Sequence, residues 1–374
     1  MRFLLITVIF STVMAAMNLY SYRRFFKKLH PPFNHYPFVI PATLLIGDIF
    51  FILDLAIGII PDSPTLYLIS STFIGLTFML FIIAVVYDLS VTISQQIPFD
   101  SERRKTLKII FDITMLIAAL SYLLRGITQG LKFPEVNHIK ISIKSFPVNG
   151  FSIVQLTDIH IGRTIKSSFI AQLVEKTNEL SPDIVVITGD LVDLPLDRIK
   201  QDLNPLSNIK APTYFITGNH EYFHNPQITI DYLKTLGIKP LLNDCVTIGD
   251  KHNNFNLIGI NDITGERVGI LKADIEQAYS KADISKPCIV LAHQPKFIER
   301  MHNHRCDLML SGHTHGGQIF PFGFLVMIDQ PYLAGLYQHN DDQQIFVSRG
   351  TGYWGPPLRI LAPSEISHIV IQNT

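Results

Sequence analysis

The chain has 374 residues and a formal net charge of zero, so its charge gives no sign of a nucleic-acid partner. Its mean hydropathy of +0.27 is high for a soluble protein and indicates a membrane part. The three cysteines, at positions 245, 288 and 306, match no zinc-binding spacing. We therefore expect them to be small core residues rather than ligands.

Four apolar segments occupy the first part of the chain, at residues 3–20, 38–60, 66–87 and 107–124. Each is about long enough to cross a ~30 Å hydrocarbon core as a helix. The first lies where a signal peptide would, but the basic stretch at 22–28 follows it at once and favours a retained span. We therefore expect an all-α transmembrane region over residues 1–130.

Three acidic residues, Asp48, Asp54 and Asp112, fall inside these apolar segments. A carboxyl group in a membrane span usually faces a bundle interior or a cavity. A proton or lipid-headgroup site would explain them, and so would a hydrogen-bonded contact between helices. Because no basic partner stands out in the spans, the contact between helices is the expected reading.

The distribution of basic residues around the spans predicts their orientation. The loops at 21–37 and 88–106 are rich in Lys and Arg, whereas the loop at 61–65 has none. The positive-inside rule places the first two loops in the cytoplasm and the third outside. With four spans, the region after residue 130 would then lie on the extracytoplasmic side of a plasma (inner) membrane.

After residue 130 the pattern changes to that of an α/β domain. Residues 131–150 are expected to form a linker and a first strand, because His138–Lys144 alternates apolar and polar residues. From Phe151 onward, β-rich runs alternate with helical stretches at 167–180, 229–236 and 271–280, and late strands are expected at 344–347 and 366–371. Alternation alone does not distinguish a single doubly wound sheet from two packed sheets.

Five of the β-rich runs are followed by side chains that can bind metal: Asp158 and His160; Asp190 and Asp193; Asn219 and His220; His293; and His313 and His315. Taken singly, each has an ordinary explanation as a turn, cap or surface residue. In extended backbone, residues i and i+2 point the same way, so His313 and His315 can face one spot. Nitrogen and oxygen ligands without a thiolate suit Mn, Fe or Zn.

The ordered motifs D-x-H, G-D-x-x-D, G-N-H-E, H and G-H-x-H resemble the calcineurin-like metallophosphoesterase superfamily over residues 151–374. The later segments Gly316–Gln318, Ser348–Gly352 and Trp354–Pro357 resemble its bacterial membrane-associated branch with N-terminal transmembrane helices. The resemblance implies a four-layer αββα sandwich and two divalent ions (Mn, Fe or Zn). The implied ligands are Asp158, His160, Asp190 and His315 for one ion, and Asp190, Asn219, His293 and His313 for the other.

The resemblance also implies a reaction, in which a hydroxide bridging the two ions attacks phosphorus in line. His220 would give a proton to the leaving alkoxide and Asp193 would hold its imidazole, although Asp193 could instead be an ordinary helix-start acid. Arg163 and Arg349 are candidate phosphate contacts, or else solvated arginines. The expected substrate is a phosphodiester or pyrophosphate, including lipid-linked forms. The alternatives are a soluble phosphomonoester or nucleotide, or a membrane sensor that binds a phospho-ligand without turnover.

Overall fold

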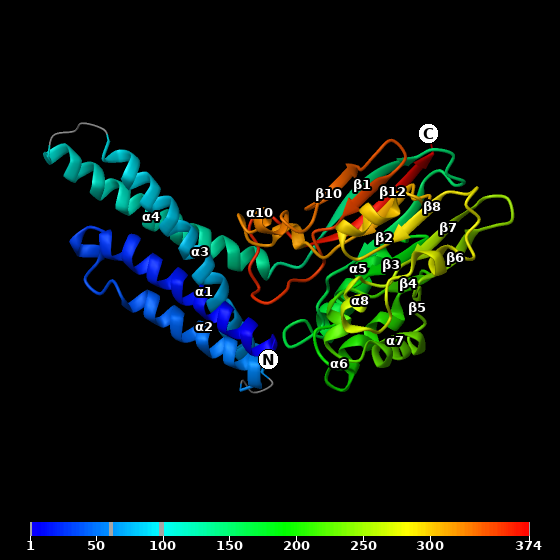
Figure 1. Cartoon of the computed structure of the whole chain (residues 1–374), viewed down its shortest axis with the longest axis horizontal. Helices are drawn as coiled ribbons and strands as arrows, with labels where there is room; N and C mark the ends of the chain where they lie inside the picture. The colour runs from blue at the N-terminus through cyan, green and yellow to red at the C-terminus, as the bar shows by residue number, and fades with distance from the viewer. Residues whose placement is uncertain (1, 60–62, 97–100, 374) are drawn as a thin grey trace. The chain divides into compact units, whose positions relative to one another are not determined.

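The computed structural model describes residues 2–59, 63–96 and 101–373 (Figure 1). Contacts divide the chain into two compact units. The helical unit contains the chain up to Leu131 together with Gly355–Ile360, and the α/β unit contains Lys132–Trp354 and Leu361–Thr374. Residue 60 of the second predicted span lies outside the described residues, as do residues 61–62 and 97–100 of the loops used to predict orientation.

Four helices form most of the helical unit: α1 (Arg2–Arg24), α2 (Val39–Ile57), α3 (Pro64–Ser94) and α4 (Ser101–Gly130). Helix α3 begins at Pro64, two residues before the predicted span, because the Ser63 hydroxyl accepts a hydrogen bond from Leu66 N–H and Pro64 occupies the first helical position. Among the described residues, Pro64–Ser94 and Glu102–Gly130 are long and apolar enough to cross a membrane. The sequence prediction of four membrane spans therefore stays a prediction.

Two of the three acids predicted inside the spans, Asp48 and Asp112, are buried and hydrogen-bonded between helices. Asp48 Oδ2 accepts hydrogen bonds from Asn18 Nδ2 and Thr77 Oγ1, both at 2.8 Å. Asp112 Oδ1 accepts a hydrogen bond from the Tyr87 hydroxyl of α3 at 2.8 Å, and its Oδ2 is 2.7 Å from Lys108 Nζ, one helical turn earlier in α4. The expectation that these acids have no basic partner was therefore wrong for Asp112, because Lys108 stands at the i−4 position of the same helix.

A short segment from the far end of the sequence, Gly355–Ile360, packs within the helical unit. The Arg359 N–H donates to the carbonyl of Gly126 in α4 at 3.0 Å, and the Arg359 side chain is fully buried. Gly130 leaves room for the segment, since a Cβ there would lie 2.0 Å from the carbonyl oxygen of Pro357. The helical unit is therefore completed by residues more than two hundred positions away in sequence.

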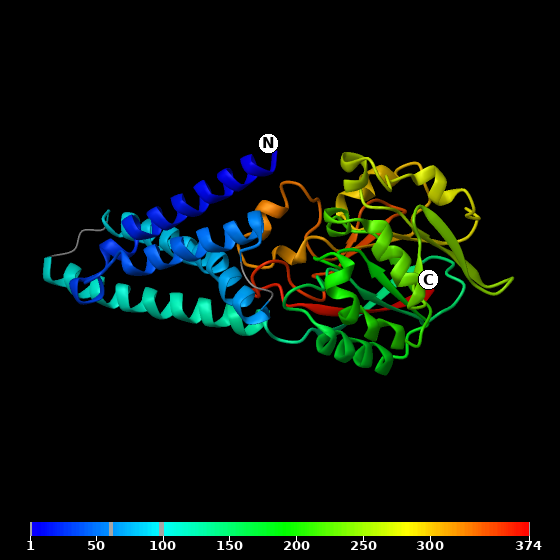
Figure 2. The same ribbon diagram turned by 90° about the horizontal axis from the view of Figure 1, so that it is seen from below.

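Two six-stranded mixed sheets form the frame of the α/β unit (Figure 2). The first has the order β1 (Glu135–Ile143), β12 (Glu365–Asn373), β2 (Phe151–Leu156), β3 (Ile184–Thr188), β4 (Thr213–Ile216) and β5 (Lys239–Pro240). The second has the order β10 (Gly335–Gln338), β11 (Gln344–Val347), β9 (Leu308–Ser311), β8 (Cys288–Leu291), β7 (Asn254–Gly259) and β6 (Asp244–Gly249).

Short helices connect the strands. They are α5 (Ser167–Glu179), α6 (Leu196–Leu203), α7 (Pro226–Thr235), α8 (Thr264–Val268), α9 (Ile275–Tyr279) and α10 (Gly323–Val326), with 3-10 turns that include η3 (Asn204–Asn208), η4 (His220–Phe223), η5 (Pro295–Met301) and η6 (His315–Gly317). The helix predicted at 271–280 is shorter in the structure. It begins only at Ile275, because the Asp274 side chain caps it by accepting a hydrogen bond from Gln277 N–H. The chain before it turns through Leu271, whose φ is 42°.

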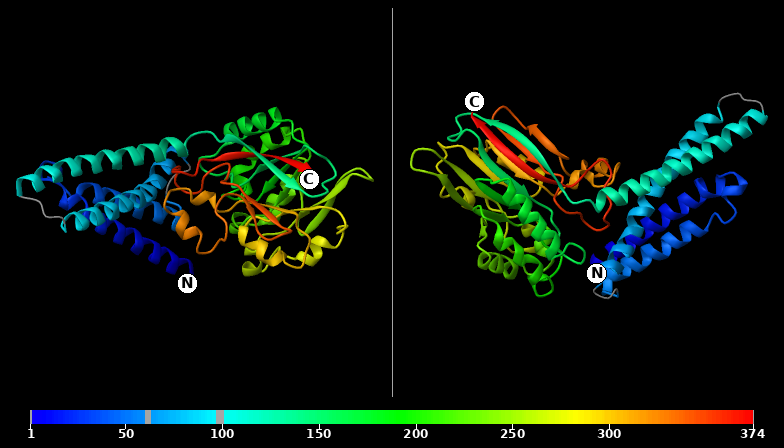
Figure 3. Two further views of the ribbon diagram at one scale, coloured as in Figure 1. Left: turned by 90° about the horizontal axis from the view of Figure 1, so that it is seen from above. Right: turned by 180° about the vertical axis from the view of Figure 1, so that it is seen from behind.

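Three hydrophobic clusters hold the α/β unit together. Figure 3 shows the path of the chain in two further views. One joins the two sheets, with Ile153 and Val186 of the first sheet and Leu291 of the second among its fully buried members. A second cluster packs α5, α6 and α7 on the first sheet, and a third packs α9 and η5 on the second. Strands β2, β3 and β4 of one sheet run parallel, as do β7, β8, β9 and β11 of the other. Their carboxyl ends lead into the loops that carry the predicted ligands.

Candidate metal centre

Every predicted metal ligand follows the end of a strand by two to four residues. Asp158 and His160 follow β2, Asp190 follows β3, Asn219 follows β4, His293 follows β8, and His313 and His315 follow β9. The strands belong to both sheets, so the candidate centre draws on loops from each. The packed strands fix where the loops begin, and this positions polar groups that could not pack in the core themselves.

The backbone at the site is strained. Five of the candidate ligands have φ values in the left-handed region, which side chains other than glycine rarely adopt: Asp158 (52°), His160 (57°), Asp190 (49°), His313 (71°) and His315 (51°). Gly189 precedes Asp190 with a φ of 89°, and a Cβ there would lie 2.6 Å from Gly218 Cα. Such strain persists only where the surrounding structure enforces it, and it clusters at functional sites.

One ligand cluster consists of Asp158, His160 and His315, whose ligand atoms lie within 4.8 Å of one another. The two Nε2 atoms of His160 and His315 are 3.1 Å apart, and His315 Nε2 is 3.4 Å from Asp158 Oδ1. His160 Nδ1 lies 2.6 Å from a carboxylate oxygen of Asp193, which fixes the proton on Nδ1. Nε2 of a neutral His160 is then left with a lone pair directed at the cluster.

A second cluster consists of Asp190, His293 and His313. His293 Nδ1 donates to the carbonyl oxygen of Thr188 at 2.8 Å, so Nε2 of the neutral ring has a lone pair. That nitrogen is 3.2 Å from Asp190 Oδ2 and 3.2 Å from Asn219 Oδ1. When His293 is neutral, three acceptor atoms converge there, and a cation in place of the imidazolium proton would satisfy them.

The buried acids and histidines of the site shift one another's pKa values. Burial opposes ionisation of Asp190, but the positive charges of His293 and His220 outweigh it and hold the Asp190 pKa well below its ordinary value. Burial likewise opposes protonation of His293, yet the Asp190 charge raises its pKa well above the usual range. By contrast, burial and the charge of His293 lower the pKa of His313 to about 4, so its imidazole is a neutral, ligand-competent donor of a lone pair.

His220 lies beside the two clusters and is held by Asp193. Its Nδ1 donates to Asp193 Oδ1 at 2.8 Å, the same oxygen that accepts from His160. Burial lowers the pKa of His220, but the charge of Asp190 and the bond to Asp193 outweigh it and raise that pKa to about 9. Ligand atoms of His160, Asp193 and His220 also lie within 4.8 Å of one another, so geometry alone would allow His220 to bind an ion too.

Glu221 is the last residue of the G-N-H-E motif and has a structural role that the sequence did not predict. Its buried carboxylate accepts backbone N–H bonds from Gly218 (2.6 Å), Asp190 (3.0 Å), Leu191 (2.9 Å) and Val192 (3.3 Å). It therefore ties the loop after β3 to the loop after β4. Burial and the charge of Asp190 raise its pKa to about 7. In the sequence, the one signal for this role was the position of Glu221 directly after the candidate site residues Asn219 and His220.

The two arginines predicted to bind phosphate differ in their surroundings. Arg349 Nε donates to Glu365 Oε2 at 2.9 Å, and its side chain runs beside Gly316, next to His315. Its guanidinium is therefore engaged in an ion pair within the α/β unit. Arg163 is half-buried in the loop after β2. The proposed phosphate contacts of both stay predictions.

Two exposed aromatic residues border His220. The ring of Phe223 is 59% exposed and its centroid is 4.4 Å from that of His220, while Trp354 is 54% exposed at 6.1 Å. The Gln318 side chain holds the backbone of Trp354: it accepts a hydrogen bond from the Trp354 backbone N–H at 3.1 Å and donates one to the Trp354 carbonyl at 2.9 Å. The site thus has an apolar rim beside a charged interior.

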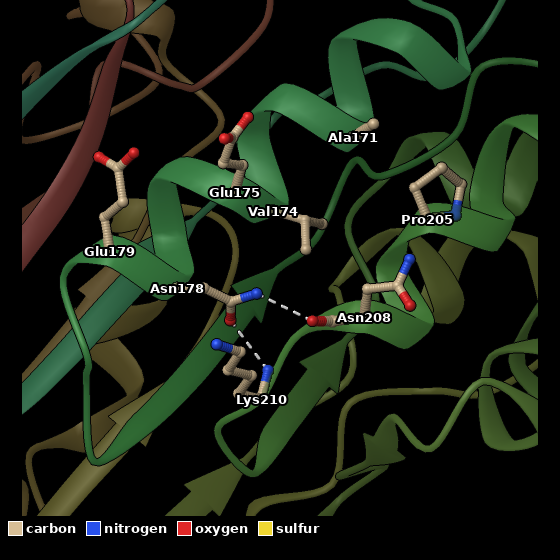
Figure 4. Close-up of a pocket in the computed structure, with 8 residues that line it drawn as sticks. All are labelled: Ala171, Val174, Glu175, Asn178, Glu179, Pro205, Asn208 and Lys210. Atoms are coloured by element: carbon tan, nitrogen blue, oxygen red, sulfur yellow. Dashed lines mark hydrogen bonds between the residues drawn. The ribbon is translucent and has the colours of Figure 1, made fainter.

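A separate surface hollow lies between α5 and η3 (Figure 4). There Asn178 Nδ2 donates to the Asn208 carbonyl at 2.9 Å, and Lys210 N–H donates to Asn178 Oδ1 at 2.9 Å. Its eight lining residues include none of the predicted ligands. We therefore assign it no part in the chemistry of the metal centre.

Comparison with known sequences gives consistent matches. The sequence model of a family described as calcineurin-like phosphoesterase matches residues 151–317. An uncharacterized metallophosphoesterase of Helicobacter pylori is 40% identical over 81% of this chain and 82% of its own length. A transmembrane protein with metallophosphoesterase domain of Danio rerio is 35% identical over 66% of this chain and 60% of its own. Phosphodiesterase YaeI of Escherichia coli is 32% identical over 54% of this chain and 75% of its own.

Among solved structures, a dimetal phosphatase from Danio rerio aligns with 56% of this chain and 90% of its own. The sequence identity is 12% and the TM-score is 0.39.

Proposed function

The chain belongs to the calcineurin-like phosphoesterase family and is a metal-dependent phosphoesterase, and we propose that it is a membrane-anchored, dimetal enzyme that hydrolyses a phosphodiester or pyrophosphate. The observation that carries the dimetal part is the convergence of acceptor atoms in two adjacent clusters. His293 Nε2, Asp190 Oδ2 and Asn219 Oδ1 meet in one, and His160, His315 and Asp158 meet in the other.

We assign the ligands accordingly. Asp158, His160, Asp190 and His315 would hold one ion, and Asp190, Asn219, His293 and His313 the other. Asp190 is the proposed bridge, because its carboxylate keeps a low pKa while buried at 2% exposure. The nitrogen and oxygen donors fit Mn, Fe or Zn. When bound, two such ions supply positive charge for the phosphoryl oxygens and acidify a water.

The residues of the chain have separate tasks in this scheme. His220 is protonated at neutral pH because its pKa is raised to about 9, so it can give a proton to the leaving oxygen. Asp193 orients that imidazole through Nδ1. Glu221 holds the loops that carry Asp190 and His220 at a fixed separation. Arg163 and Arg349 are the proposed contacts for phosphate oxygens.

The organisation we propose has a transmembrane region at residues 1–130, a linker and first strand at 131–150 and the catalytic domain at 151–374. The cluster shared by both sheets and the helix clusters on their other faces support a four-layer αββα sandwich. The two apolar helices among the described residues, and the transmembrane relative in Danio rerio, support membrane association. Four spans with the catalytic domain on the extracytoplasmic side of the plasma membrane remain part of the proposal.

The substrate class is proposed rather than fixed by the fold, since one metal centre can serve many substrates. The relative named a phosphodiesterase favours a diester. A soluble phosphomonoester or nucleotide is the alternative, and nucleic acid is not an expected partner. The sensor reading is disfavoured because every motif position is filled by a ligand-competent residue.

The test is an assay of the purified full chain, stripped of metal and reconstituted with Mn, Fe or Zn, on chromogenic monoesters, chromogenic diesters and lipid phosphodiesters in detergent. The proposal expects metal-dependent turnover with diesters preferred and close to two ions per chain. Full activity in protein without bound ions would overturn the dimetal reading. A preference for soluble monoesters would select the alternative substrate class.

A further inference from the structure

An apolar surface segment follows directly after the last candidate ligands. We call Ile319–Ile328 the apolar loop; it has ten residues and no charged side chain. Six of its large apolar side chains are exposed, and the four most exposed are Phe324 (67%), Leu325 (55%), Met327 (52%) and Ile328 (82%). A contiguous exposed patch of this kind marks an interaction surface, because isolated apolar residues need no explanation but clusters do.

The apolar loop is firmly attached to the metal-binding loop. Ile319 N–H donates to the Gly317 carbonyl at 2.5 Å, and Phe322 N–H donates to the Ile319 carbonyl at 2.8 Å. Gly317 and Gly323 pack so closely that a Cβ at position 317 would lie 2.4 Å from Gly323 Cα. On the far side, the Thr314 hydroxyl donates to the Leu333 carbonyl at 2.6 Å. The exposed side chains are therefore presented by an ordered turn and not by a loose loop.

We propose that the apolar loop inserts into the surface of a lipid bilayer. A bilayer that holds the apolar helix α4 would lie close to the α/β unit, because the connection between them is short: α4 ends at Gly130 and β1 begins at Glu135. Those five steps along the chain span at most about 18 Å. The absence of charge and the aromatic and aliphatic composition of the apolar loop suit the boundary between headgroups and acyl chains.

This inference rests on the membrane anchoring in the proposed function and narrows its substrate. An apolar loop seated in the bilayer directly after His313 and His315 would let a lipid keep its acyl chains in the membrane while its phosphate reaches the metal centre. Trp354 suits the same boundary, because an indole ring combines an apolar body with a polar N–H. The substrate class that fits is a phosphodiester or pyrophosphate whose alcohol carries a lipid tail.

The test uses the full chain in vesicles of phosphatidylethanolamine and phosphatidylglycerol. A nitrobenzoxadiazole label is attached to Phe324→Cys, and nitroxide groups on the lipid acyl chains serve as quenchers. Ile284→Cys is the matched control, since Ile284 is also a large apolar residue of the α/β unit with 67% exposure. The native cysteines are buried, and burial raises the pKa of Cys245 and Cys288 to about 11, so unmodified protein should label slowly.

Quenching at position 324 should exceed that at position 284 at least threefold. Equal quenching at the two sites, or none at 324, would overturn the proposal; the second result would point to a protein partner. As a second readout, Phe324→Asp combined with Ile328→Asp should lower turnover of vesicle-bound lipid substrate at least tenfold while soluble diester turnover is kept. Loss of both activities would refute a docking role. Failure of the unmodified protein on every phosphoester would count against the proposed function, whereas the quenching result stands independently of it.

Discussion

Removing the Glu221 carboxylate should be the most damaging single change to the α/β unit outside the ligands themselves. This buried carboxylate accepts four backbone N–H bonds from two loops. An Ala at this position leaves all four donors without an acceptor. At about 1–3 kcal/mol for each unsatisfied buried donor, the loss is about 4–12 kcal/mol, comparable to the whole stability of ~5–15 kcal/mol of a typical protein.

Glu221→Gln is the more informative variant because it keeps the shape. The amide retains one oxygen, which can serve the two N–H groups now bound to one carboxylate oxygen, and turns an NH₂ toward the other two. The expected cost is about 2–6 kcal/mol, from two donors left unpaired. Asp190 N–H and Gly218 N–H bind the same oxygen, Oε2, so the loops bearing Asp190 and Asn219 should separate where the amide nitrogen takes the place of that oxygen. Metal content and turnover should fall together.

The measurement is thermal unfolding of the full chain in detergent, with ions per chain and soluble diester turnover determined on the same samples. Glu175→Gln is the control, because Glu175 is an exposed acid on α5. It should match the unmodified protein in all three measurements. If Glu221→Ala folded with unchanged stability and kept both ions, the reasoning from unsatisfied donors would be refuted.

Four further outcomes are expected. Asp190→Asn should abolish turnover and reduce metal content below two ions, because a neutral amide cannot offset two dications; an active variant would refute the bridge. His220→Ala should keep its ions and lose turnover most for poor leaving groups, and loss of metal instead would make His220 a ligand. Turnover should fall as pH rises through the His220 pKa of about 9, since the imidazolium is the acid. Asp193→Asn should move this alkaline fall in turnover to lower pH, because the Asp193 carboxylate raises the His220 pKa. An unchanged pH profile would exclude the contact between Asp193 and His220 as its cause. Single cysteines at Ser63 and Asn340, in protein lacking the native three, should react with an impermeant thiol reagent on intact cells, and labelling only after lysis would place the catalytic unit in the cytoplasm.

Local sequence signals predicted the elements that depend on local physics. The helix expected at 167–180 is α5 at Ser167–Glu179, and the strand expected at 344–347 is β11 with the same bounds. The position of β12 between β1 and β2 had no such signal, since it depends on pairing of the final residues with strands more than two hundred positions earlier.

The candidate site divides in the same way. The positions of its candidate ligands could be predicted because each follows a strand end, and apolar runs in the sequence mark where the strands lie. The role of Glu221 could not, because its partners near Asp190 are backbone groups about thirty positions away, and any residue supplies the same N–H. The shared use of Asp193 by His160 and His220 also needed coordinates, since the sequence suggested only the second contact.

The placement of Gly355–Ile360 means that this protein cannot be divided by a single cut. A stand-alone enzyme made by deleting residues 1–130 would keep Leu358 and Arg359, both fully buried in the intact chain, yet lose the glycine-lined surface of α4 that receives their segment. Such a product would expose the side chains of Leu358 and Arg359 to solvent, and the apolar surface would favour aggregation. Exchange of the helical unit between relatives is constrained likewise. A foreign helical unit must accommodate Gly355–Ile360, so recombination at residue 131 alone would leave this segment without a matching surface.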